Sequence, residues 1–184
     1  MWNSRDVAIV ILLSVGGFGY TALIGQIGLL LTGIPGVNYF FTAGHAIFVS
    51  TGFLLFEGRK WRFFLQATLF SILTLPTYLM GTPYDILTRL PLILTGFQAD
   101  LLFNSLYKTF ERRKKIGIWA ILCSIEFFII DPFLRILTYP LFLPQQYTST
   151  FTIVTLLLQP IIIAEAVAGG YMGFKIYQRV RNLG

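Results

Sequence analysis

The basic residues of this chain are confined to alternate gaps between its apolar runs, and this pattern restricts the possible folds more than any other feature. Apart from Arg89 and Arg135, every Lys and Arg lies at the start of the chain, in two loops or in the tail, at positions 5, 57–62, 108–115 and 175–181. The three intervening loops contain none. Short cytoplasmic loops of membrane proteins collect Lys and Arg. The alternation therefore predicts a polytopic membrane protein with both termini in the cytoplasm.

The composition agrees with helices that cross a membrane. Hydrophobic residues make up 55% of the 184 residues and charged residues 12%, whereas soluble domains contain about 25% charged residues. A membrane-spanning helix needs about 20 apolar residues. We therefore expect an all-α fold in which one integral membrane domain, 1–184, forms a bundle of six transmembrane helices at about 7–31, 41–56, 63–80, 85–107, 116–140 and 150–177.

The residue inventory disfavours several function classes. The net charge of +6 follows the loop positions above, so no nucleic-acid partner is predicted. Cys123 is the only cysteine and His45 the only histidine, which excludes an internal disulfide and argues against a histidine-rich metal site. No GxSxG, P-loop or HExxH motif is present, so we expect no enzyme, no ATPase within the chain and no cofactor. The first apolar run is too long for a signal-peptide core and is expected to be retained.

The apolar run 116–140 carries Glu126, Asp131 and Arg135. A charged side chain at membrane depth costs at least ~2.5–3.5 kcal/mol, so such residues usually face a bundle interior or a polar cavity. Three of them on a lipid-facing surface would be unfavourable. The run therefore predicts a small-molecule site that the other spans enclose.

Two pairs of charged residues are expected near the outer surface. Counted at ~1.5 Å per residue, Asp85 and Arg89 lie near the outer end of one span, and Asp131 and Arg135 lie in the outer half of another. Each pair is spaced i, i+4 and can form an ion pair within its own helix. Two interpretations stay open: interfacial ion pairs, or a ligand pocket that opens outward beneath the uncharged loops.

The deeper acidic residues are Glu126, Asp100 and Glu165. A straight helix cannot aim Glu126 at the same pocket as Asp131 and Arg135, because they lie about 140° and 180° away around its axis. Pro132 allows a kink there. We expect Glu126 and Glu165 to contact ligand. For Asp100 we expect a structural role, either capping a helix or pairing with a cytoplasmic basic residue.

Further candidates come from the first outer loop and from two glycine-rich segments. His45 has either a ligand contact or a packing role, and Asn38 and Tyr39 are expected to supply amide and aromatic contacts. Small residues on one helix face allow another helix to approach closely. In the first span, Gly17, Thr21 and Gly25 form such a small face, because they are spaced i, i+4, i+8. This small face serves either contact with an external partner or packing within the bundle. For the glycines of 164–173 we expect core packing.

Four stretches of the chain resemble the substrate-binding S component of energy-coupling factor (ECF) transporters, a vitamin-uptake family of prokaryotes. They are NSRDVAIVILL at 3–13, IPGVNYFFTAGHAIF at 34–48, EGRKWRFF at 57–64 and TGFQADLLF at 95–103. The resemblance implies six helices in the cytoplasmic membrane, both termini cytoplasmic, and a ligand pocket in the outer half. It also implies two kinds of partner, a transmembrane coupling protein and two cytoplasmic ATPases, and release of the substrate by toppling in the membrane.

The sequence departs from this family at two places. The family contacts its coupling protein through alanines four apart on helix 1, but Ala8 is followed by Leu12 here, and the small face is expected to take over that contact. The metal-specific branch begins with Met–His, whereas this chain begins with Met1 and Trp2, which argues against nickel or cobalt.

We expect a membrane-embedded binding subunit for a small, vitamin-like nutrient. Aromatic rings would stack on the ligand. The acidic residues suit a cationic or hydrogen-bond-donating ligand and the arginines suit a carboxylate or phosphate, and the sequence leaves both open. The alternatives are a lipid-modifying membrane enzyme that uses buried carboxylates, and a non-catalytic assembly protein whose charges pair with one another.

Overall fold

The computed structural model describes residues 2–81 and 83–182, and these form helices and turns without a β-strand. The all-helical prediction is confirmed for this part of the chain. Three of its helical segments are long and apolar enough to cross a membrane, which indicates a membrane protein: Ser4–Thr32, Ile116–Leu141 and Gln145–Asn182.

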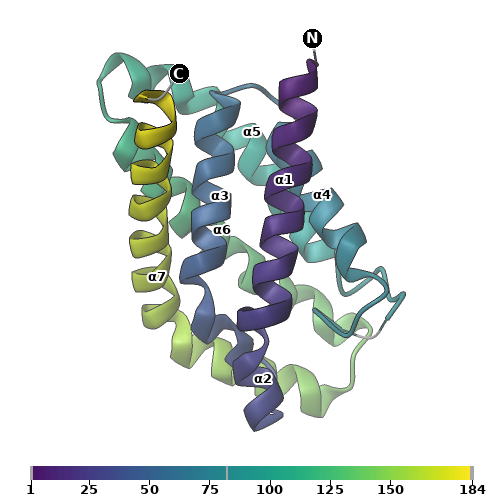
Figure 1. The fold of residues 1–184 in the computed structure, drawn as a ribbon. Helices are drawn as coiled ribbons and strands as arrows, with labels where there is room; N and C mark the ends of the chain where they lie inside the picture. The colour runs from purple at the N-terminus through teal and green to yellow at the C-terminus, as the bar shows by residue number, and fades with distance from the viewer. Residues whose placement is uncertain (1, 82, 183–184) are drawn as a thin grey trace.

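The first segment is helical but not uniform (Figure 1). α1 (Ser4–Tyr20) continues into one π-helical turn, Thr21–Gly25, and then into α2 (Ile27–Thr32). The Thr21 hydroxyl donates a 2.9 Å hydrogen bond to the carbonyl oxygen four residues earlier. π-helical turns are rare and occur frequently at functional sites. α2 ends at Gly33, whose φ of 66° is left-handed and suits glycine.

The next two helices are short. α3 (Ala43–Phe56) has 14 residues and α4 (Arg62–Thr74) has 13. At 1.5 Å per residue each is about 20 Å long, shorter than the ~30 Å hydrocarbon core of a bilayer. α4 ends at Thr74, before the expected boundary at 80, and Pro76, which follows shortly after, has no N–H to donate to a continuing helix.

The last three helices are longer. α5 (Leu90–Arg112) starts later than the expected boundary at 85, with Pro91 in its first turn, where proline is tolerated. α6 (Ile116–Thr138) and α7 (Gln145–Asn182) follow, and Pro132 lies within α6 without interrupting it. The expected run 116–140 thus corresponds to α6 together with the short 3-10 turn after it.

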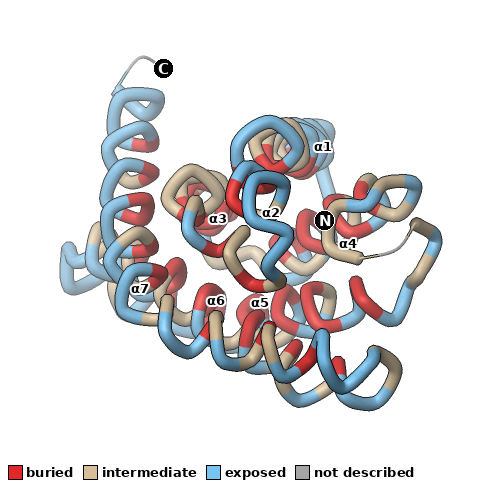
Figure 2. The backbone as a smooth tube through the Cα atoms, turned by 90° about the horizontal axis from the view of Figure 1, so that it is seen from below, coloured by how far each residue is buried: buried red, intermediate tan, exposed pale blue. Residues whose placement is uncertain are grey.

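The helices pack as a bundle with α3 and α6 in contact across it. α7 lies along both α3 and α6, while α4 packs against α1 and α5. α1 begins and α7 ends at the same end of the bundle (Figure 1). Seen from the opposite end, the buried parts of the helices face inward and the exposed parts face outward (Figure 2).

Glycines on α7 bring it close to its neighbours, as expected from the sequence. A Cβ atom at Gly169 would collide with the carbonyl oxygen of Ala43 and with Ala46. At Gly170 it would lie 2.9 Å from the Cα atom of Ile121 on α6. The prediction that these glycines serve core packing is therefore confirmed.

Gly169→Leu is expected to destabilise the bundle by about 1–3 kcal/mol, since a larger side chain at a packed helix contact forces the helices apart. Ala168→Leu is the matched control, because Ala168 is exposed on the same helix. Unfolding in detergent with increasing SDS measures both variants. Equal midpoints for the two would contradict the close α3–α7 contact.

Side chains fill the bundle near the basic loops. Trp119 is fully buried and donates a hydrogen bond of 3.2 Å to the carbonyl oxygen of Phe103. The rings of Phe53 and Phe63 stack with centroids 3.9 Å apart, and Tyr107 packs edge-on against Trp119.

Two buried carboxylates hold this same end together. Asp100 of α5 accepts hydrogen bonds of 2.8 and 2.9 Å from the backbone N–H groups of Trp61 and Phe64, at the start of α4. These are N–H groups that a helix leaves unpaired, and a negative charge is favourable there. The expected structural role of Asp100 is thus helix capping. Asp6, which the sequence did not single out, forms ion pairs with Arg59 and Arg62 at 2.7 and 3.1 Å.

Candidate ligand-binding site

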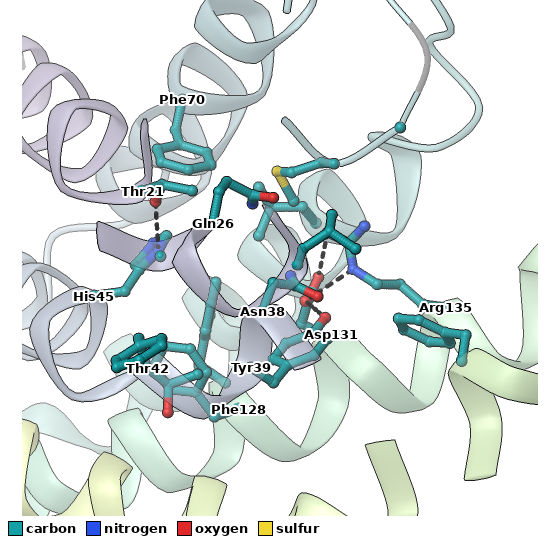
Figure 3. Close-up of a pocket in the computed structure, with 18 of the residues that line it drawn as sticks. Thr21, Gln26, Asn38, Tyr39, Thr42, His45, Phe70, Phe128, Asp131 and Arg135 are labelled. Carbon is teal, nitrogen blue, oxygen red and sulfur yellow. Dashed lines mark hydrogen bonds and ion pairs between the residues drawn. The ribbon is translucent and has the colours of Figure 1, made fainter. Parts of the chain in front are cut away.

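A cavity with a volume of about 770 Å³, its mouth included, lies beneath the three loops that lack Lys and Arg. Its walls come from the π-helical turn, from α3, α4, α5, α6 and α7, and from loop residues such as Asn38 and Gly81. Figure 3 shows the polar side chains that face it from several elements.

The cavity is lined mainly by aromatic rings. Nine Phe and Tyr side chains surround it, which are Tyr20, Tyr39, Phe41, Phe70, Phe127, Phe128, Tyr139, Tyr147 and Phe151. Flat aromatic walls favour ligands with flat rings, because stacked or edge-on rings attract each other beyond the area they bury.

One ion pair is buried in the wall. The Asp131 carboxylate binds the Arg135 guanidinium through two hydrogen bonds of 3.0 and 3.1 Å, and both side chains are at most 6% exposed. The predicted i, i+4 pairing of these residues is confirmed. Arg135 also donates to the hydroxyl of Tyr139 and, at 3.2 Å, to the carbonyl oxygen of Thr88.

Tyr39 connects the loop between α2 and α3 to this pair. It lies in the 3-10 turn Val37–Phe41 and donates a 2.6 Å hydrogen bond from its hydroxyl to the Asp131 carboxylate. Burial raises the pKa of Tyr39 well above its usual value, so the hydroxyl keeps its proton at neutral pH. Both carboxylate oxygens of Asp131 are therefore engaged by neighbours from the chain itself.

His45 stands in the first turn of α3 with its ring among Phe70, Phe127 and Phe128 (Figure 3). Its Nδ1 atom lies 3.4 Å from the hydroxyl oxygen of Thr21. The ring also lines a second, deeper cavity of about 300 Å³. His45 thus lines both spaces.

Two side-chain amides face the cavity without a partner from the described part of the chain. Gln26 follows the π-helical turn and is 5% exposed, and Asn38 lies in the loop between α2 and α3. Neither amide makes a hydrogen bond to another described residue. Both amides line the cavity and can each donate and accept hydrogen bonds, which makes them suitable for binding a polar ligand.

Five of the eight expected ligand-contact residues line this cavity: Asp131, Arg135, His45, Asn38 and Tyr39. They come together because the loop between α2 and α3 meets α6, where Tyr39 binds Asp131. The other three, Arg89, Glu126 and Glu165, do not line it.

Arg89 organises the loop between α4 and α5. Fully buried, it donates hydrogen bonds of 3.0–3.1 Å to four backbone carbonyl oxygens, those of Thr74, Thr77, Leu79 and Asp85. Carbonyl groups at a helix C-terminus lack partners within the helix. Arg89 supplies such a partner where α4 ends.

The two remaining acidic residues lie at separate places. Glu165 of α7 accepts hydrogen bonds of 2.6 and 3.2 Å from the backbone N–H groups of Thr42 and Ala43 and caps the start of α3. Glu126 of α6 does not line the cavity and lies near Gln98 of α5. Its carboxylate oxygens are shielded from solvent.

The small face of the first span is buried within the chain. Gly17 packs against Phe70, while Thr21 and Gly25 line the cavity. These residues serve packing within the bundle, which is one of the two interpretations left open by the sequence.

Sequence reasoning missed Gln26 and most of the aromatic wall. No motif marks Gln26, because its inward direction depends on the π-helical turn before it. Phe127 and Phe128 follow Glu126 directly and could have been proposed from the helical rotation, since they lie near the face that carries Asp131.

The fold and the cavity together define an all-helical protein with apolar helices of membrane-crossing length and an aromatic small-molecule cavity at one end. No family model matches the chain, and no curated protein or solved structure is significantly similar to it.

Proposed function

We propose that the chain is a six-span binding subunit of a prokaryotic uptake transporter, similar to the S component of ECF transporters. In this proposal both termini are cytoplasmic and the cavity opens outward. A small, water-soluble, vitamin-like nutrient binds there, and a transmembrane coupling protein with two cytoplasmic ATPases drives its release into the cell.

The cavity carries this proposal. It lies at the end whose loops lack Lys and Arg, which is the outer end by the positive-inside rule. It combines aromatic walls with a few polar groups from different elements, the usual make-up of a small-molecule site. The helical segments run alternately between the two ends of the bundle, which supports six spans even though α3 and α4 are short.

The two alternatives have less support. An enzyme that uses buried carboxylates would group them at one depth, but Asp100 and Glu165 each cap a helix and Glu126 lies elsewhere. An assembly protein without a ligand would need no cavity with unpartnered amides.

The test is mass spectrometry of the small molecule released when the detergent-purified protein is denatured. We expect about one vitamin-like molecule per chain. Gly25→Leu should abolish its retention, because Gly25 lines the cavity. Gly19→Leu is the matched control, since a Cβ atom there meets nothing within 4 Å.

Two results would contradict the proposal. One is an empty protein whose melting temperature no vitamin in a panel raises. The other is equal retention by the Gly25→Leu and Gly19→Leu variants.

A further inference from the structure

The cavity wall carries no net charge. Asp131 and Arg135 are the charged side chains that line it. The two side chains are joined by two hydrogen bonds, and their opposite charges balance. The Tyr39 hydroxyl donates a further hydrogen bond to the carboxylate. A charged ligand would lose its hydration on entry and find no free counter-charge. An uncharged ligand avoids this cost.

The hydrogen bonds of Thr21 determine which nitrogen of His45 carries the proton. The Thr21 hydroxyl donates its hydrogen to the carbonyl oxygen of Gly17. Its oxygen can therefore only accept from His45, whose Nδ1 must carry hydrogen in this contact. In the neutral ring Nε2 is then an acceptor. His45, whose ring lines the cavity, accordingly has its acceptor at Nε2, and this atom can take a hydrogen bond from a donor on the ligand.

Gln26 and Asn38 add two amides that can each both donate and accept. Gln26 directly follows the π-helical turn, Asn38 lies in the loop between α2 and α3, and His45 lies on α3 (Figure 3). Aromatic walls combined with a few polar groups from different elements suit a flat ring system whose polar atoms are on its perimeter.

We infer that the ligand is an electrically neutral, planar nitrogen heterocycle that donates an N–H hydrogen bond to Nε2 of His45 and pairs its amide-like edge with Gln26 and Asn38. This inference rests on the proposed function and names the substrate class of the same site. The sequence left open a cationic or hydrogen-bond-donating ligand and a ligand with a carboxylate or phosphate, and the inferred ligand corresponds to the hydrogen-bond-donating one.

Matched probes of different charge test the inference on the full-length, ligand-free protein in detergent. The first set is nicotinamide, nicotinate and 1-methylnicotinamide, which are neutral, anionic and cationic with nearly the same shape. The second is riboflavin and its phosphate ester. Calorimetry gives Kd, and the rise in melting temperature gives an independent measure.

We expect the neutral member of at least one set to bind at least tenfold more tightly than its charged partners. Equal or tighter binding of a charged member overturns the inference and leaves the proposed function standing. Where no probe binds, the molecule released from the purified protein decides, because a neutral heterocycle supports the inference and a charged or acyclic molecule overturns it. If no probe binds and the purified protein releases no small molecule, the proposed function is overturned as well.

Two substitutions at His45 test its role on whichever neutral ligand binds. His45→Phe keeps a ring among the neighbouring aromatic side chains but removes the acceptor, and should weaken binding about tenfold or more. His45→Gln places an amide oxygen near the Nε2 position and should restore part of the loss. An unchanged Kd for His45→Phe, with unchanged stability, would overturn the assigned hydrogen bond.

Discussion

Asp131→Asn is expected to destabilise the folded chain by about 3–5 kcal/mol, because it leaves Arg135 as an uncompensated charge in a buried site. The substitution keeps the shape of the side chain, so the effect measures charge more than packing. It also disturbs the contacts of Tyr39 and Tyr139, which meet at this pair. SDS-induced unfolding in detergent gives the free-energy difference.

The double variant Asp131→Asn with Arg135→Met is the control. Replacing a whole buried ion pair by less polar residues is often neutral, whereas removing one partner is not. We therefore expect the double variant to recover most of the lost stability. A double variant that is no more stable than Asp131→Asn would show that the two charges are not coupled.

Asp131→Asn alone should also change which ligand the cavity prefers. With Asp131 neutralised, Arg135 retains a free positive charge in the cavity wall, and nicotinate should gain affinity relative to nicotinamide. Arg135→Met leaves the opposite charge and should favour 1-methylnicotinamide. Unaltered preferences in both variants would contradict the balanced-charge account of the cavity.

Arg89→Leu is the second substitution with a large expected effect, a loss of about 3 kcal/mol or more. It removes hydrogen bonds to four backbone carbonyl oxygens at the end of α4 and in the following loop. Hydrogen bonds to charged groups contribute ~1.5–3 kcal/mol each, and carbonyl groups left unpaired in the interior add to the loss. Because this loop also supplies Met80 and Gly81 to the cavity, ligand retention should fall together with stability.

Arg113→Leu is the matched control, since Arg113 is exposed beyond the end of α5. Its effect should stay within about 0.5 kcal/mol. If the two arginine variants unfold at the same SDS fraction, the loop does not depend on Arg89.

Hydropathy and residue spacing anticipated the all-helical fold, the segment that became α6 and the Asp131–Arg135 pair. These features are local, because a helix brings together two side chains that are four residues apart, whatever surrounds it. The end of α4 and the start of α5 differ from the expected boundaries at 80 and 85. For α4, the apolar stretch continues past Pro76, and hydropathy does not register the missing N–H.

The roles of the charged residues depended on contacts between distant segments. Glu165 and Arg89 both looked like ligand residues, because a charge in an apolar run signals a polar partner. The partners turned out to be the backbone ends of α3 and α4. A sequence shows that such a charge needs a partner but does not show which helix end will reach it.

By itself, therefore, the sequence determined the helical class, the apolar segments and the separation of charge between the loops, since each follows from residue type and local spacing. Only the tertiary structure decided that Asn38, Tyr39 and His45 meet Asp131 and Arg135 around one cavity, and that Gln26 joins them. The reason is physical: the loop between α2 and α3, the π-helical turn and α6 are distant in sequence, and their side chains meet only through helix packing.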